Sequence, residues 1–151
     1  MSESETWSDL TIREIENHIK CLLTRIPALQ SRLRYECAYG RRRGSDVVIF
    51  MTDENQEHSL RFEIEQYASG SGLDRKVSAW AERHSRPNTT TVVVSLVLQA
   101  LHNRLVHEFS RNDTVANMVF SPNFRLFPGS GDGKITDELK QFITRWIEQK
   151  L

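Results

Sequence analysis

Carboxylates, glycines and two hydroxyl groups lie close together in residues 129–142, GSGDGKITDELKQF. If Gly133 takes the sixth position of a twelve-residue calcium-binding loop, Asp132 and Thr136 take the fifth and ninth positions, both of which supply ligands. The first position is then Pro128 and the twelfth is Leu139, so the first carboxylate and the closing glutamate are both missing. We therefore expect no calcium site here. The pattern predicts a flexible glycine turn, followed by a helix with Thr136 at its N-cap.

A second pair of carboxylates belongs to Glu63 and Glu65, which point to the same side of a predicted strand. Two such groups lie about 7 Å apart and can serve acid–base chemistry. The alternative is a solvated sheet face, with Arg61 and Arg34 as cross-strand partners, and we favour that interpretation.

No other catalytic or metal-binding pattern stands out in the chain. Cys37 falls on the inward side of a predicted strand, where a buried thiol is inert. The five histidines lie on separate elements or, for His102 and His107, at a spacing that does not face one metal ion. P-loop, dinucleotide-binding, nucleophile-elbow and HExxH motifs are absent from the sequence. We expect no catalytic residues, no metal site and no cofactor.

Basic residues gather in one segment, RLRYECAYGRRRG, which has five arginines interleaved with two tyrosines. Three of these arginines are consecutive at the predicted tip of a hairpin, where they can contact phosphates or an acidic partner. The alternative is a soluble turn that blunts a sheet edge. The candidate binding residues are Arg34, Arg41, Arg42, Arg43, Arg75 and Lys76.

These residues need a scaffold, and the hydrophobic pattern predicts most of it. A helical stripe runs through residues 12–26, with a capping box at Thr11 and Glu14. Strands are expected at residues 33–39, 47–51 and 60–65, and further helices at residues 73–84 and 139–147. For residues 89–96 we favour the start of a helix from about residue 92, with a fourth strand as the alternative.

The predicted fold is therefore α+β. It is an antiparallel meander of three to four strands, with helices packed on one face and amphipathic helices at both ends. We divide the chain into a polar tail, residues 1–10, and a single domain, residues 11–151.

Composition limits the functional classes. The 151 residues are 38% hydrophobic and 26% charged, which is typical of a globular chain. The net charge of zero argues against strong indiscriminate binding of polyanions. The sequence has no apolar run of the length that a membrane span needs, and we expect no membrane partner. Its two cysteines and polar, acidic first residues predict a cytoplasmic or otherwise intracellular location.

Residues 11–84 have the element order of a double-stranded-RNA-binding domain, helix, three strands and helix. The segment GSGLDRKVSAW resembles the glycine-rich turn and basic helix start of that family. Arg75 and Lys76 match its first two basic positions. Ala79 stands where a third lysine is expected, and the family's turn after the first strand is absent. The resemblance covers half of the chain and implies RNA binding.

We interpret the sequence as a small intracellular, non-catalytic binding or adaptor domain that engages a protein partner. The first alternative is an RNA-binding protein, and the second is a small enzyme with an unrecognised site. Each hypothesis predicts a different surface. An adaptor needs an exposed apolar patch, an RNA-binding protein needs its arginines and Lys76 on one surface, and an enzyme needs a deep pocket with titratable groups.

Overall fold

A computed structural model describes residues 6–40, 45–66 and 72–151. These residues form one domain around a five-stranded sheet with strand order β1-β2-β3-β4-β5. The strands are β1 (Leu33–Cys37), β2 (Val47–Asp53), β3 (Gln56–Glu65), β4 (Thr89–Ser95) and β5 (Phe124–Pro128). The helices are α1 (Trp7–Arg25), α2 (Gly72–His84), α3 (Leu98–Phe109), α4 (Asp113–Val119) and α5 (Asp137–Glu148), with a short 3₁₀ turn, η1, at Pro27–Ser31.

The sheet is mixed, so the expected antiparallel meander is wrong. Strands β1, β2 and β3 are antiparallel neighbours as predicted, but β3–β4 and β4–β5 are parallel pairs. Parallel neighbours need a long crossover, and α2 supplies the crossover between β3 and β4. The predicted α+β class is confirmed, but the sheet has five strands and not the predicted three to four.

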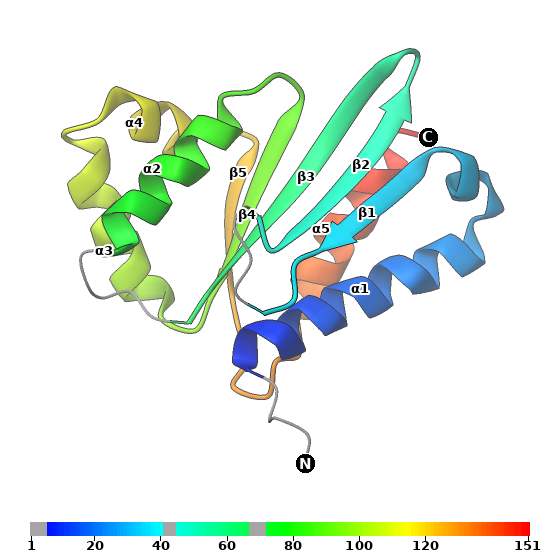
Figure 1. Ribbon diagram of the computed structural model, residues 1–151, viewed down its shortest axis with the longest axis horizontal. Coiled ribbons are helices and arrows are strands. Elements are labelled where there is room, and N and C mark those ends of the chain that lie inside the picture. The colour runs from blue at the N-terminus through cyan, green and yellow to red at the C-terminus, as the bar shows by residue number, and fades with distance from the viewer. Residues whose placement is uncertain (1–5, 41–44, 67–71) are drawn as a thin grey trace.

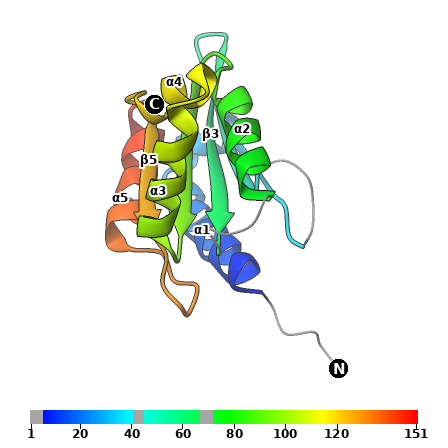
Figure 2. The same ribbon diagram turned by 90° about the vertical axis from the view of Figure 1, so that its left-hand side faces the viewer.

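Helices cover both faces of this sheet, not one face as predicted. Figures 1 and 2 show α1 and α5 on one side, and α2, α3 and α4 on the other. Each side has its own apolar core, and neighbouring residues of β4 alternate between them, with Val92 and Val94 in the first and Val93 in the second. In particular, helices α1 and α2 lie on opposite faces of a mixed sheet, and not together on one face of an antiparallel sheet.

Strand β4 corrects the favoured helix start at residue 92. Threonine and valine make up six of its seven residues, Ser95 is the seventh, and all seven are buried. Because β-branched side chains pack well on both faces of a central parallel strand, the buried sheet position outweighs the helical spacing that follows. Helix α3 begins only at Leu98.

The two terminal helices are amphipathic as predicted. Helix α1 begins earlier than expected, because Thr6 caps it by accepting a hydrogen bond from the backbone N–H of Asp9. Helix α5 begins after Thr136, as predicted, and the hydroxyl group of Thr136 accepts from the N–H of Leu139. Among the described residues, no helix is both long and apolar enough to cross a membrane.

Candidate functional site

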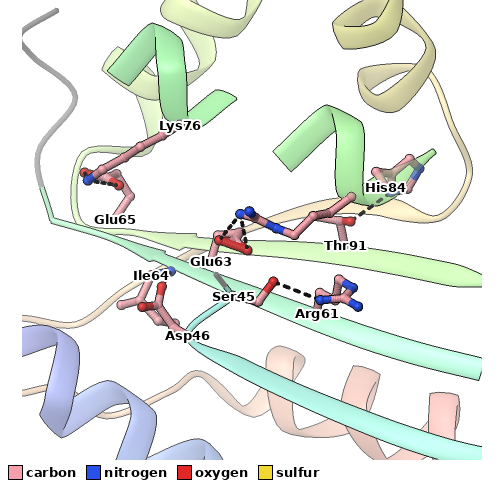
Figure 3. A network of polar contacts seen from close by, with 10 residues as sticks. Ser45, Asp46, Arg61, Glu63, Ile64, Glu65, Lys76, His84 and Thr91 are labelled. Atoms are coloured by element: carbon pink, nitrogen blue, oxygen red, sulfur yellow. Dashed lines mark hydrogen bonds and ion pairs between the residues drawn. The ribbon is translucent and has the colours of Figure 1, made fainter. Parts of the chain in front are cut away.

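A pocket of about 440 Å³ lies between the start of β2, the end of β3 and helix α2. Its acidic side chains are Asp46, Glu63 and Glu65, and its basic side chains are Lys76 and Arg83. Figure 3 shows the three carboxylates along the strands, with Lys76 reaching Glu65 from helix α2. We call this feature the carboxylate pocket.

Asp46 reaches the pocket because it immediately precedes β2. Its backbone N–H donates to the carbonyl oxygen of Phe62 at 3.0 Å, which continues the ladder with β3. Its Oδ2 accepts from the backbone N–H of Ile64 at 2.7 Å. Since Ile64 lies between Glu63 and Glu65 in sequence, this bond places the Asp46 carboxylate beside both glutamates.

Glu63 and Glu65 lie on the face of β3 that helix α2 covers. Their side chains are only 5% and 8% exposed, so the expected solvated face is wrong. Their ionic partners also differ from the predicted Arg61 and Arg34. Arg83 approaches Glu63 at 3.2 Å, and Lys76 approaches Glu65 at 3.1 Å.

Burial is the main reason why two of these carboxyl groups have a raised pKa. It raises the pKa of Asp46 to about 6, assisted by the negative charge of Glu65 and opposed by the hydrogen bond from Ile64. Burial also raises the pKa of Glu63 to about 7, against the favourable charge of Arg83 and with a further increase from Asp46. The carboxylates are therefore close enough to oppose one another's ionisation, although cations stand beside them.

Two buried acids with raised pKa values in a pocket are typical of catalytic sites, because a group near neutral pH can both accept and donate protons. The basic groups add a preference for negative ligands. The Lys76 side chain is 57% exposed and carries a mobile point charge, whereas that of Arg83 is 21% exposed.

The donor set fits a hard divalent cation. Carboxylate oxygens are the ligands that Mg²⁺ prefers, and this ion is usually held by one or two carboxylates together with waters and substrate phosphates. Within the described ranges, no three His, Cys, Asp or Glu residues form a group that could hold a metal ion. The three carboxylates of the pocket therefore do not form a three-ligand metal site, and an ion bound there would have at most two of them as ligands.

The predicted arginine surface is only partly described. Arg41, Arg42 and Arg43 lie outside the described residues. Arg34 pairs with Glu36 and Glu57, and its guanidinium lies 3.8 Å from the ring centre of Phe50. Lys76 belongs to the carboxylate pocket, whereas Arg75 is exposed on α2. The structure thus separates Arg34 and Lys76 into different ion-pair groups.

The remaining chemical candidates have local partners. Burial and the charge of Glu16 raise the pKa of the Cys37 thiol to about 12, so this thiol is not a thiolate at neutral pH. His18 contacts the Lys140 carbonyl and the Thr144 hydroxyl group, and His84 contacts Thr91. Burial lowers the pKa of both histidines.

Sequence reasoning found the two glutamates but missed Asp46 and Arg83. The available signal was an aspartate directly before the apolar run VVIF, next to a strand with two alternating glutamates. No family model, curated protein or solved structure matches this chain.

Proposed function

We propose that this protein is a hydrolase that cleaves phosphate esters with a divalent cation, and that the carboxylate pocket is its active site. The observation that carries the proposal is the meeting of three carboxylates with Lys76 and Arg83 in one pocket. Of the three hypotheses from the sequence, the enzyme is the one that required a pocket of titratable groups. The proposal departs from the expected non-catalytic domain without a metal or cofactor.

Each charged group has a role in this proposal. Asp46 and Glu65 would hold the cation, and the chemistry it would supply there is polarisation of a phosphoryl oxygen and a lower pKa for a bound water. Lys76 has a flexible side chain, so it can leave its ion pair with Glu65 and bind a substrate phosphate. Glu63, with a pKa of about 7, accepts or donates a proton near neutral pH.

Phosphate esters are favoured over glycosides as substrates. Glycoside hydrolysis needs two carboxyl groups on either side of the scissile bond, and it does not call for cations beside them. Here each pocket glutamate has the charged nitrogen of a basic side chain, Lys76 or Arg83, within 3.2 Å. An anionic substrate can bind to these basic side chains, whereas a neutral sugar would give them no ionic partner.

The test is a hydrolysis assay with bis(p-nitrophenyl) phosphate and a labelled oligonucleotide, in Mg²⁺, in Mn²⁺ and in chelator. We expect metal-dependent cleavage that Asp46→Asn and Glu65→Gln abolish. The matched control is Asp53→Asn, which changes an aspartate at the other end of β2 and should leave cleavage intact. A wild-type protein that neither cleaves these substrates nor binds Mn²⁺ in calorimetry would refute the proposal.

The protein-partner and RNA-binding hypotheses stay predictions. Among the described residues, the large hydrophobic side chains that are exposed are Val106, Phe120 and Leu151, which lie on separate segments. An intracellular location is supported by Cys21 and Cys37, which are both free thiols, since reducing compartments preserve them. A pull-down from native cells, with and without nuclease, distinguishes a protein partner from RNA.

A further inference from the structure

Arg61 lies two residues before Glu63 on the same face of β3, yet it has no carboxylate partner among the ion pairs of the described residues. Its Nη1 lies 3.5 Å from the Ser45 hydroxyl oxygen, at the outer limit of a hydrogen bond. Its Nε is buried and has no hydrogen-bond partner. Figure 3 shows Arg61 and Ser45 beside Glu63.

A buried N–H without a partner is costly, particularly on a charged group, and it often marks the place of an ion or water. Arg104 provides the comparison, because its Nε is also buried without a partner. The guanidinium of Arg104, however, forms an ion pair with Asp74. Arg61 has no equivalent counter-charge, so its guanidinium keeps its capacity for an anion.

The charges of two other arginines act on Arg61. Burial and the positive charges of Arg86 and Arg83 lower the pKa of Arg61, while the negative charges of Glu63 and Glu36 raise it. Arg83 is engaged by Glu63, but Arg86 is exposed just beyond the end of α2. Like charges oppose one another unless an anion lies between them.

We propose that the Arg61 guanidinium forms an oxyanion subsite next to the carboxylate pocket and that this subsite binds a phosphate group. Guanidinium groups match phosphate geometry through two parallel N–H donors. The further step, that this phosphate is a second phosphate of the substrate cleaved in the pocket, rests on the proposed function.

The subsite is tested by titrating the full chain with inorganic phosphate and following the arginine Nε–Hε resonances by ¹⁵N NMR. We expect a saturable shift of the Arg61 resonance in the wild type. Arg86→Gln removes an exposed positive charge that acts on Arg61 and leaves the core undisturbed, so it should weaken phosphate binding. Arg75→Gln, an exposed change on α2, should bind like the wild type.

Arg61→Lys keeps the charge and removes the guanidinium fork, so it should weaken phosphate binding while Mn²⁺ binding stays unchanged. Asp46→Asn should lose hydrolysis but keep the Arg61 shift, which separates failure of the subsite from failure of the proposed active site. The subsite is refuted if the wild-type Arg61 resonance does not respond to phosphate. It is also refuted if Arg86→Gln and Arg61→Lys bind phosphate as tightly as Arg75→Gln.

Discussion

Asp46 and Ile64 join two strands through a side chain: the Asp46 carboxylate accepts from the Ile64 backbone N–H at 2.7 Å. This bond continues the contact between β2 and β3 beyond the last residue pair of their ladder, Val47 with Phe62. It also holds a carboxylate beside two others, where burial alone already opposes its charge. The backbone of the sheet therefore stabilises the charged form of a buried acidic group of the pocket.

Substitutions at Asp46 should separate the hydrogen bond from the charge. Asp46→Asn keeps an oxygen acceptor for Ile64, so its free energy of unfolding at pH 7 should stay within about 1 kcal/mol of the wild type. Asp46→Ala leaves the N–H without its acceptor and should lose roughly 1–3 kcal/mol. Urea denaturation measures both variants, and equal losses would show that Ile64 does not depend on this acceptor.

Glu63 should make stability fall as the pH rises. Its folded pKa of about 7 exceeds its ordinary value of 4.5, so between these values the native state binds more protons than the unfolded state. The free energy of unfolding therefore decreases through this window, and the loss is complete above it. Relative to the wild type, Glu63→Gln should gain roughly 2–3 kcal/mol between pH 5 and pH 8, since one pKa unit is about 1.4 kcal/mol.

Urea denaturation at these two pH values tests the Glu63 prediction. Glu82→Gln is the matched control, because Glu82 is an exposed glutamate on helix α2. Its stability difference from the wild type should stay constant with pH. A Glu63→Gln difference that is equally constant would mean that Glu63 titrates normally in the folded protein.

Gly133 should tolerate no side chain. Its φ is +83°, and a Cβ there would lie 2.5 Å from the Cβ of Leu10 in helix α1. Gly133→Ala should therefore cost more than 1 kcal/mol, from backbone strain and displacement of Leu10 together. Gly131→Ala is the control, because no atom lies within 4 Å of its added Cβ, and it should be neutral. Thermal unfolding compares the two, and equal melting temperatures would contradict the tight contact.

Local patterns predicted the elements whose signals are contained in their own residues. The antiparallel strands β1 to β3 and the helix capped by Thr136 follow from alternation, helical spacing and capping. Strand β5 was missed, because its five residues include a terminal proline and give too short a pattern. Its position at the sheet edge, paired with β4, tolerates the proline.

The carboxylate pocket could be predicted only in part for a related reason. Alternation put Glu63 and Glu65 on one face, but whether that face meets water or a helix depends on where α2 crosses the sheet. The crossover to the parallel strand β4 puts α2 over them, and Lys76 and Arg83 with it. Asp46 reaches the pocket because of the register in which β2 pairs with β3. That register cannot be read from the sequence of either strand alone.

Trp146 should anchor α5 in the apolar core between the sheet and helices α1 and α5. Its side chain is buried, at 6% exposed, and the indole N–H donates to the Thr90 hydroxyl oxygen on β4 at 3.2 Å. Trp146→Ala should lower the free energy of unfolding by about 3–5 kcal/mol, the usual loss for a large buried aromatic side chain. Trp146→Phe keeps most of the ring volume but loses the donor, so it should fall between Trp146→Ala and the wild type.

Phe120→Ala is the control for the anchoring of α5, because Phe120 is 72% exposed and meets the edge of Phe109. It should cost at most about 1 kcal/mol. Urea denaturation of the three variants ranks them. If Trp146→Ala unfolds at the same urea concentration as the wild type, helix α5 contributes little to the core. Its apolar face would then be free to bind a partner, as the adaptor hypothesis requires.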